Sequence, residues 1–207
     1  MRDGMINLLF VTEMPKEAKK KLLYAGLKLF TEEGYQKTSV LEIVEMARVS
    51  KTTFYQHFKS KEEIMVALFE VLASEIIEEV KKSISKENRI TYKAFAGIHR
   101  YIEICYEYKD VAKVVLVESV GVSRNVEKAR QKAHQEFAVM IFQTVQAELP
   151  STVSEKGMKI VSQAMVGAIN EVVMQNFFVA ENERVDFEEL SRLLNRIVIS
   201  SFVNLAM

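Results

Sequence analysis

The sequence predicts an all-α fold, and three features of the chain lead to this prediction. Apolar residues recur at intervals of three to four positions along most of its 207 residues, which is the spacing of a buried helix face. Only two prolines and seven glycines interrupt the chain, so long helices are favoured over a turn-rich β fold. The sequence contains neither the alternating pattern of a β-strand nor an internal repeat. We therefore expect helices joined by short turns.

Two helices are expected at the start of the folded region. Residues 16–33 form the first, because their apolar side chains fall on one stripe and Gly34 follows where a C-cap glycine belongs. Ser39 and Glu42 then match a capping box, in which the serine oxygen and the glutamate carboxylate satisfy backbone N–H groups of the first turn. A short second helix should therefore follow Ser39 and end near Arg48.

A third short helix should begin after Ser50, which is a natural N-cap, and end near Phe58. Phe54 and Phe58 lie four positions apart and form its buried edge. Two short helices with a tight turn between them, and a further helix to pack against, make a helix-turn-helix arrangement. The second of the two can enter the DNA major groove, which is about 12 Å wide. Its outer face is polar, aromatic and basic, with Thr52, Tyr55, Gln56 and Lys59.

The rest of the chain is expected to be helical as well. Ser60 begins another capping box, which opens a long helix. Pro150 stops a later one, and Asp186 caps the last. The expected helices span residues 60–83, 91–107, 110–120, 125–149, 154–180 and 186–205.

The charge is unevenly distributed although the formal net charge is zero. Between residues 15 and 61, ten Lys and Arg stand against five Glu, so this segment carries about +5 and the remainder about −5. A basic N-terminal segment on an acidic body is what a nucleic-acid contact at one end requires.

The composition excludes several other classes of protein. Hydrophobic residues make up 49% and charged residues 27%, as in ordinary globular domains. No apolar run approaches the roughly 18 residues of a membrane span, so we expect no membrane partner. Cys105 is the single cysteine, which fits a reducing cytoplasm. Residues 1–12 lack a signal-peptide cleavage site; we interpret residues 1–15 as a flexible extension, with Met14 as an alternative start.

The segment GYQKTSV at residues 34–40, followed by Ile43 and by ARVSKTTFYQHFKSKE at residues 47–62, closely resembles the signature of the TetR family of bacterial regulators. The resemblance covers roughly residues 16–69. It implies a helix-turn-helix DNA-binding domain at residues 16–62 and a helical effector-binding and dimerisation domain at residues 63–207. It also implies a homodimer whose repression of transcription is relieved by a small molecule. A two-fold protein matches a palindromic operator, and the apolar residues expected in the pocket, given below, suggest that the small molecule is hydrophobic.

The resemblance also suggests roles for individual residues. Lys51, Thr52 and Thr53 are candidates for base contact, and Gln56 lies on the same outer face. Tyr55, His57 and Lys61 resemble phosphate-positioning residues, whereas Thr38 and Ser39 match residues that cap a helix and touch the DNA backbone. The alternatives are a half-buried aromatic for Tyr55 and a structural role for His57.

Arg48 departs from the family pattern. The family usually has glycine at this turn, where a left-handed conformation costs arginine about 1 kcal/mol relative to glycine. Either the turn differs, or Arg48 gains a phosphate contact.

Two sets of residues are expected in the C-terminal domain. Large, adaptable side chains with a few polar anchors predict an effector pocket, although such residues can also be plain core. They are Tyr101, Cys105, Tyr106, Glu118, Phe137, Met140, Ile141, Met165, Asn170 and Phe177. The dimer interface is expected on the last two helices, although these residues can also pack inside one chain. It comprises Val161, Ala164, Met165, Ala168, Val172, Leu194, Ile197, Val198 and Phe202.

We find no sequence signal for an enzyme, a cofactor or a metal. The chain has no phosphate-cradling glycine loop, His-Glu metal motif or nucleophile elbow. Cys105, His99 and His134 fit no zinc spacing. The rival interpretation is a helical interaction protein, or an enzyme whose N-terminal DNA-binding domain is vestigial. The sequence leaves open the operator, the effector, the regulated genes, and repression as opposed to activation.

Overall fold

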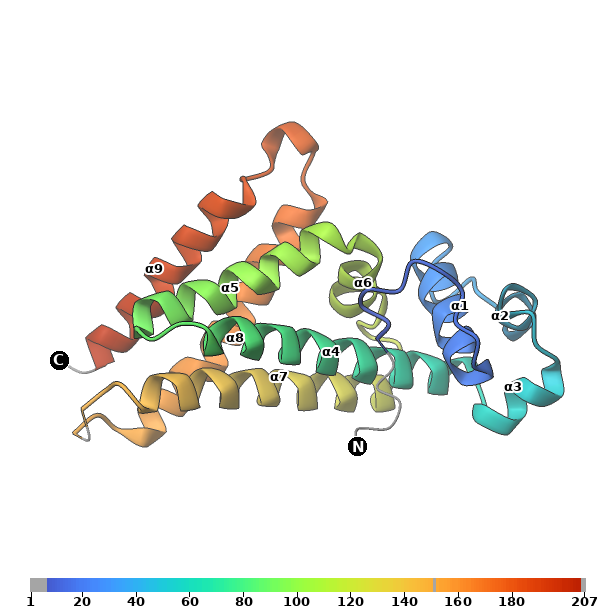
Figure 1. The fold of residues 1–207 in the computed structure, drawn as a ribbon, viewed down its shortest axis with the longest axis horizontal. Coiled ribbons are helices and arrows are strands. Elements are labelled where there is room, and N and C mark those ends of the chain that lie inside the picture. The colour runs from blue at the N-terminus through green and yellow to red at the C-terminus, as the bar shows by residue number, and fades with distance from the viewer. Residues whose placement is uncertain (1–6, 151, 206–207) are drawn as a thin grey trace. The chain divides into compact units, whose positions relative to one another are not determined.

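The computed structural model describes residues 7–150 and 152–205, and all regular structure in these ranges is helical (Figure 1). The all-α prediction is confirmed. The chain forms two compact units. Unit 1 comprises the chain up to Glu75 together with Tyr108–Gln131, and unit 2 comprises Ile76–Glu107 together with the chain from Lys132. This division differs from the predicted domain boundary after residue 62, because the long helix that begins at Lys61 continues from unit 1 into unit 2.

Unit 1 is built around three short N-terminal helices. These helices are α1 (Ala18–Glu32), α2 (Val40–Ala47) and α3 (Lys51–His57). The unit also contains the first part of α4 (Lys61–Ser85), α6 (Lys109–Lys113), the π-helix η1 (Val114–Glu118) and the start of α7 (Arg124–Gln146).

Local capping fixes the ends of these helices as the sequence predicts. Gly34 has a φ of +89° directly after α1. Ser39 Oγ accepts a hydrogen bond of 3.2 Å from the N–H of Glu42, whose carboxylate accepts one of 2.7 Å from the N–H of Ser39. Ser50 Oγ accepts the N–H of Thr53 at 3.0 Å. The two caps leave α2 and α3 separated by only a short turn.

The α6–η1 segment is joined to the C-terminal end of α1 by polar contacts. Lys28 forms an ion pair of 2.5 Å with Asp110, and Lys113 donates a hydrogen bond to the carbonyl oxygen of Thr31. The sequence predicts one continuous helix over residues 110–120, whereas the structure changes to π-helical geometry at Val114. Such insertions are short and arise under local constraint.

Residues 7–14 of the N-terminal extension pack against the rest of unit 1. The expectation that the extension is flexible is therefore wrong for these residues. We call these residues the N-terminal strap. Leu8 and Leu9 are buried in unit 1, and the carboxylate of Glu75 accepts hydrogen bonds from both of their N–H groups. Phe10 packs edge-on against Tyr108. The sequence hides these contacts because the strap has no helical period. Residues 1–6 lie outside the described residues.

Unit 2 is a helical bundle. It contains the remainder of α4 and α7 together with α5 (Ile90–Glu107), α8 (Glu155–Phe178), the short 3₁₀-helix η2 (Glu181–Glu183) and α9 (Phe187–Leu205). In Figure 1, α9 lies alongside α5. Asn176 holds the α8–α9 connection by accepting the N–H of Val185 at 3.0 Å and donating to its carbonyl oxygen at 3.1 Å. No helix in the described ranges combines the length and the apolar character needed to cross a membrane.

Candidate nucleic-acid interface and ligand cavity

Helix α3 presents a polar face to solvent and buries its phenylalanines. Phe54 and Phe58 are buried in unit 1, whereas Tyr55 is 59% exposed. This is the arrangement that a groove-reading helix needs, since the buried edge fixes the helix while the outer face stays available. The exposed residues of this face are Lys51, Thr52, Tyr55, Gln56 and His57.

Thr53 is less available than its neighbours on α3. Its side chain is half-buried, and its Oγ1 lies 2.9 Å from Ser50 Oγ within the N-cap. The hydroxyl therefore contributes to the start of the helix as well as lying near its outer face.

Arg48, for which the sequence left open whether the turn differs, adopts the left-handed conformation with φ 51° and ψ 49°. It is the only non-glycine residue with positive φ among residues 7–150 and 152–205. Its backbone N–H closes the end of α2 on the carbonyl oxygens of Val44 and Glu45, and the residue is exposed. The turn therefore holds an arginine in a conformation that costs it about 1 kcal/mol relative to glycine.

Thr38 does not offer its side chain to DNA, in contrast to the sequence-based assignment. It is 2% exposed, and its Oγ1 donates a hydrogen bond of 2.9 Å to the carbonyl oxygen of Gly34. Sequence alone does not show whether such a threonine faces solvent or closes the turn before a helix. The neighbouring Ser39 is exposed, and its hydroxyl is part of the α2 cap.

The structure places Lys61 as a clamp on the α1–α2 loop. Its Nζ donates to the carbonyl oxygens of Tyr35, Gln36 and Thr38 at 2.7, 3.2 and 2.8 Å. Nζ also lies 4.4 Å from the centre of the Tyr35 ring. Burial lowers the pKa of this ammonium, partly opposed by Glu42. All three N–H donors are therefore used internally, and a direct phosphate contact would break one of these bonds.

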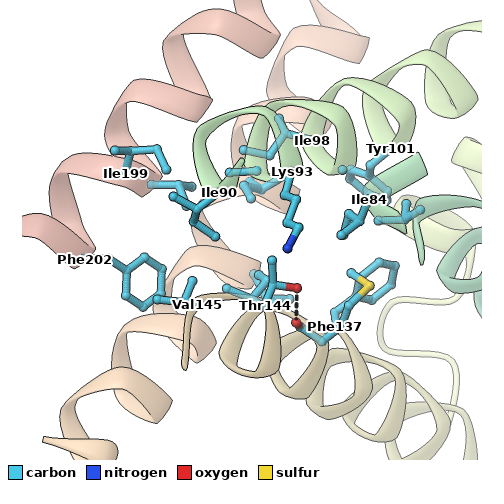
Figure 2. A pocket seen from close by; sticks show the side chains of 18 of the residues that line it. Ile84, Ile90, Lys93, Ile98, Tyr101, Phe137, Thr144, Val145, Ile199 and Phe202 are labelled. Carbon is cyan, nitrogen blue, oxygen red and sulfur yellow. Dashed lines mark hydrogen bonds between the residues drawn. The ribbon is translucent and has the colours of Figure 1, made fainter. Parts of the chain in front are cut away.

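A second site is a cavity of about 150 Å³ inside unit 2 (Figure 2). Its walls come from α4, α5, α7, α8 and α9. Five of the ten residues expected in an effector pocket line it, and these are Tyr101, Phe137, Met140, Ile141 and Asn170.

The other five residues expected in the pocket lie elsewhere. Glu118 belongs to unit 1, where its carboxylate accepts the N–H of Tyr35 at 2.9 Å. Cys105 is buried in the core, and burial raises the pKa of its thiol to about 12. Tyr106 donates a hydrogen bond to the carbonyl oxygen of Val185. Met165 and Phe177 of α8 are not among the residues that line the cavity.

Several lining residues were missed by sequence reasoning. Ile90, Ala94, Gly97 and Ile98 on α5 recur every three to four positions and continue to the expected Tyr101, so this period could have identified them. The contributions from the end of α4 and from α9 had no such signal, because their apolar positions are equally typical of core. They include Val80, Ile84, Val198, Ile199, Phe202 and Val203.

Polar groups in the cavity wall are paired with one another. Tyr101 donates a hydrogen bond of 2.6 Å to Asn170 Oδ1. Thr144 donates to the carbonyl oxygen of Met140 at 2.8 Å, the dashed line in Figure 2. Lys93 Nζ lies 3.3 Å from Glu148 Oε1. The wall is otherwise mainly aliphatic and aromatic, which suits an apolar ligand.

The residues expected in a dimer interface separate into two groups. Ala164, Ala168, Val172 and Ile197 are exposed, and Val161 and Met165 are half-buried. Leu194, Val198 and Phe202 are instead buried within unit 2. Helix α9 carries two apolar stripes, and the sequence does not show which of them packs inside the chain.

Among the described residues, no group of three or more His, Cys, Asp or Glu side chains is placed to hold a metal ion. His99 pairs with Glu188 at 2.8 Å, and His134 Nε2 lies 3.3 Å from Asn170 Nδ2. The two histidines and Cys105 therefore have separate surroundings.

Comparison with known proteins gives consistent matches. Residues 22–68 match the model of a family described as bacterial regulatory proteins, tetR family. The HTH-type transcriptional regulator YuxN of Bacillus subtilis is 29% identical over 123 residues, or 58% of this chain and 42% of that protein. The fatty acid metabolism regulator protein of Bacillus subtilis is 23% identical over 186 residues, or 89% of this chain and 95% of that protein.

A solved structure shows the same fold over nearly the whole chain. It is the transcriptional regulator FadR from Bacillus subtilis in complex with stearoyl-CoA, with a TM-score of 0.74 and 19% identity. The match covers 87% of this chain and 97% of that one. The relatives named here are regulators and not enzymes.

Proposed function

The chain is a transcriptional regulator of the tetR family, and we propose that it represses transcription as a homodimer that binds palindromic operator DNA and leaves it when a hydrophobic effector binds. The single observation that carries the DNA-binding part is the exposed face of α3. Tyr55 stands out from this face while Phe54 and Phe58 anchor the helix from within.

The contacts with DNA divide into two kinds. Lys51, Thr52 and Gln56 lie on the exposed face of α3 and are placed to read base edges, with Thr53 at its border. Tyr55, His57, Ser39 and Arg48 are exposed around it and would contact phosphates, which position the protein without reading sequence.

The proposed dimer forms through α8 and α9. Along α8, Ile160, Ala164, Ala168 and Val172 are exposed at intervals of four residues, which places them on one side of the helix. Apart from its chain neighbours and the backbone of its own helix, a Cβ added at Gly167 would meet no atom of the described residues within 4 Å, so close approach by another helix is sterically allowed. A two-fold dimer presents two recognition helices, as an inverted-repeat operator requires.

The proposed effector site is the cavity of unit 2. Its aliphatic wall favours a ligand with a large apolar part. The relative solved with stearoyl-CoA supports the same class of ligand. Helix α4 contributes residues to both units, so a ligand that shifts the population of α4 conformations in unit 2 can act on DNA binding.

A band-shift measurement with DNA from the chain's own promoter tests the DNA-binding part. We expect the full chain to bind this fragment more tightly than a scrambled one, and Tyr55→Ala to weaken binding strongly. The matched control is Lys128→Ala, which changes an exposed residue of α7 in the same unit. Equal binding of the promoter and scrambled fragments would leave the helical interaction protein as the better interpretation.

A further inference from the structure

We propose that the cavity selects an amphiphile with an aliphatic chain and a single carboxylate head, and that this carboxylate replaces Glu148 as the partner of Lys93. The inference rests on the proposed function, because it names the chemical class of the effector. It concerns two residues that form one ion pair in the cavity wall.

Lys93 and Glu148 are the only charged residues among those described that line the cavity. Lys93 is on α5, and its amine extends into the space bordered by Ile84, Ile90 and Thr144 (Figure 2). A single fixed ammonium in an aliphatic cavity is an anchor for one anionic group.

The ion pair between Lys93 and Glu148 can be replaced by an ion pair between Lys93 and a ligand carboxylate. The side chains are 25% and 34% exposed, and their closest atoms are 3.3 Å apart, so solvent screens much of their attraction. A carboxylate that replaces Glu148 keeps the charge interaction, and its chain also buries apolar surface. Burial of the aliphatic tail supplies the gain that all ligands of one length share, and a carboxylate adds to it by pairing with Lys93 away from the solvent that screens Glu148.

The geometry favours an anionic ligand, which would pair with Lys93, over a cationic ligand, which would pair with Glu148. Glu148 lies in the turn after α7 ends at Gln146, whereas Lys93 lies within α5 and reaches the cavity from a helix. The carboxylate is also the more exposed of the two side chains. The acid can thus turn to solvent when a ligand enters, whereas the ammonium stays at the cavity.

The other polar side chains of the wall already bond to one another or to backbone. Tyr101 is bonded to Asn170, and Thr144 is bonded to the carbonyl oxygen of Met140. A neutral hydroxyl can accept a hydrogen bond from Lys93 Nζ, but only a carboxylate also replaces the negative charge of Glu148. Lys93 is therefore the group that distinguishes a carboxylate from an alcohol of the same length.

Calorimetric titration of the full chain with decanoate and with decanol tests the proposal. We expect decanoate to bind about tenfold more tightly than decanol, which corresponds to one hydrogen bond to a charged group. Lys93→Met, which keeps most of the apolar stem, should remove this preference. Glu148→Gln should tighten decanoate binding severalfold and leave decanol unchanged.

A lysine outside the cavity wall provides the control, and thermal melting provides a second measurement. Lys156→Met changes an exposed lysine of α8 outside the cavity wall and should leave both affinities unchanged. Circular dichroism melting checks that each variant is folded. Equal affinity for the two probes, a preference that persists in Lys93→Met, or no binding of either probe would each overturn the proposal.

Promoter binding is measured on the same samples. Promoter binding without a Lys93-dependent preference for decanoate would overturn this inference and leave the DNA-binding function in place. A Lys93-dependent preference without promoter binding would support the cavity assignment and contradict the regulator.

Discussion

Glu75 accepts a hydrogen bond of 2.7 Å from the backbone N–H of Leu9, 66 positions away in the chain. Its other carboxylate oxygen accepts the N–H of Leu8 at 3.0 Å. The N-terminal strap is thereby an integral part of unit 1, because its two leucines are buried and its backbone donors are satisfied.

Leu9→Ala should lower the free energy of unfolding by about 2–5 kcal/mol, because it removes a fully buried side chain and leaves a cavity. Urea denaturation of the full chain measures the change. Thr12→Ala is the control within the strap, since its side chain is exposed, and should change stability by less than about 0.5 kcal/mol. If a chain that starts at Met14 is as stable as the full one, the strap does not contribute to the fold.

Glu75 should make stability depend on pH. Burial raises its pKa from 4.5 to about 7, opposed by the two N–H donors. The folded state therefore binds more protons than the unfolded state between these values. The contribution of Glu75 to the free energy of unfolding is fully present below pH 4.5. It is lost as the pH rises through 7, a change of roughly 3 kcal/mol. Urea midpoints from pH 4 to 8 measure it, and Glu75→Gln should flatten this part of the profile; an unaltered profile would contradict it.

Lys61→Met should lower stability and leave the salt dependence of DNA binding unchanged. The ammonium holds three carbonyl oxygens of the α1–α2 loop, so its loss should cost about 1–3 kcal/mol of unfolding free energy. If Lys61 instead binds a phosphate, the slope of log affinity against log salt should fall by roughly one charge. Denaturation and band-shift titrations at several salt concentrations separate the two roles.

Arg48→Gly should separate backbone strain from DNA contact. Glycine adopts the left-handed conformation without the penalty, so stability should rise by up to about 1 kcal/mol. Operator affinity should fall if the guanidinium contacts a phosphate. Unfolding curves and promoter titrations of the same variant give both quantities, and a loss of stability would refute the assigned strain.

Cys105 should be inert in the folded chain. It is 3% exposed, and burial raises the pKa of its thiol to about 12, so almost no thiolate is present near neutral pH. Reaction with a chromogenic disulfide should be slow in buffer and fast in denaturant. A fast reaction in buffer would show that the core around α5 opens readily.

Features that depend on neighbours in sequence were predictable, and features that depend on distant partners were not. Ser39 and Ser50 cap their helices through bonds to residues three positions away, so the pattern alone identifies them. The three carbonyl partners of Lys61 lie 23 to 26 positions away, and no local pattern indicates them.

The candidate ligand site illustrates the same limit. Tyr101 and Phe137 were expected in the cavity because large apolar residues recur along their helices. Val198 and Phe202 were assigned to the dimer interface although they line the cavity, because α9 has apolar residues on two sides. Which stripe faces inward depends on the packing of α9 on α5, and the pattern of one helix does not contain that information.

Nuclease footprinting of the chain's own promoter tests the central claim most directly. We expect one protected inverted repeat, with half-sites about one helical turn or a multiple of it apart. This protection should be lost in Tyr55→Ala, whose side chain stands exposed on α3. A promoter without any protected site, or protection that survives Tyr55→Ala unchanged, would contradict the assignment of α3 as the DNA-reading helix.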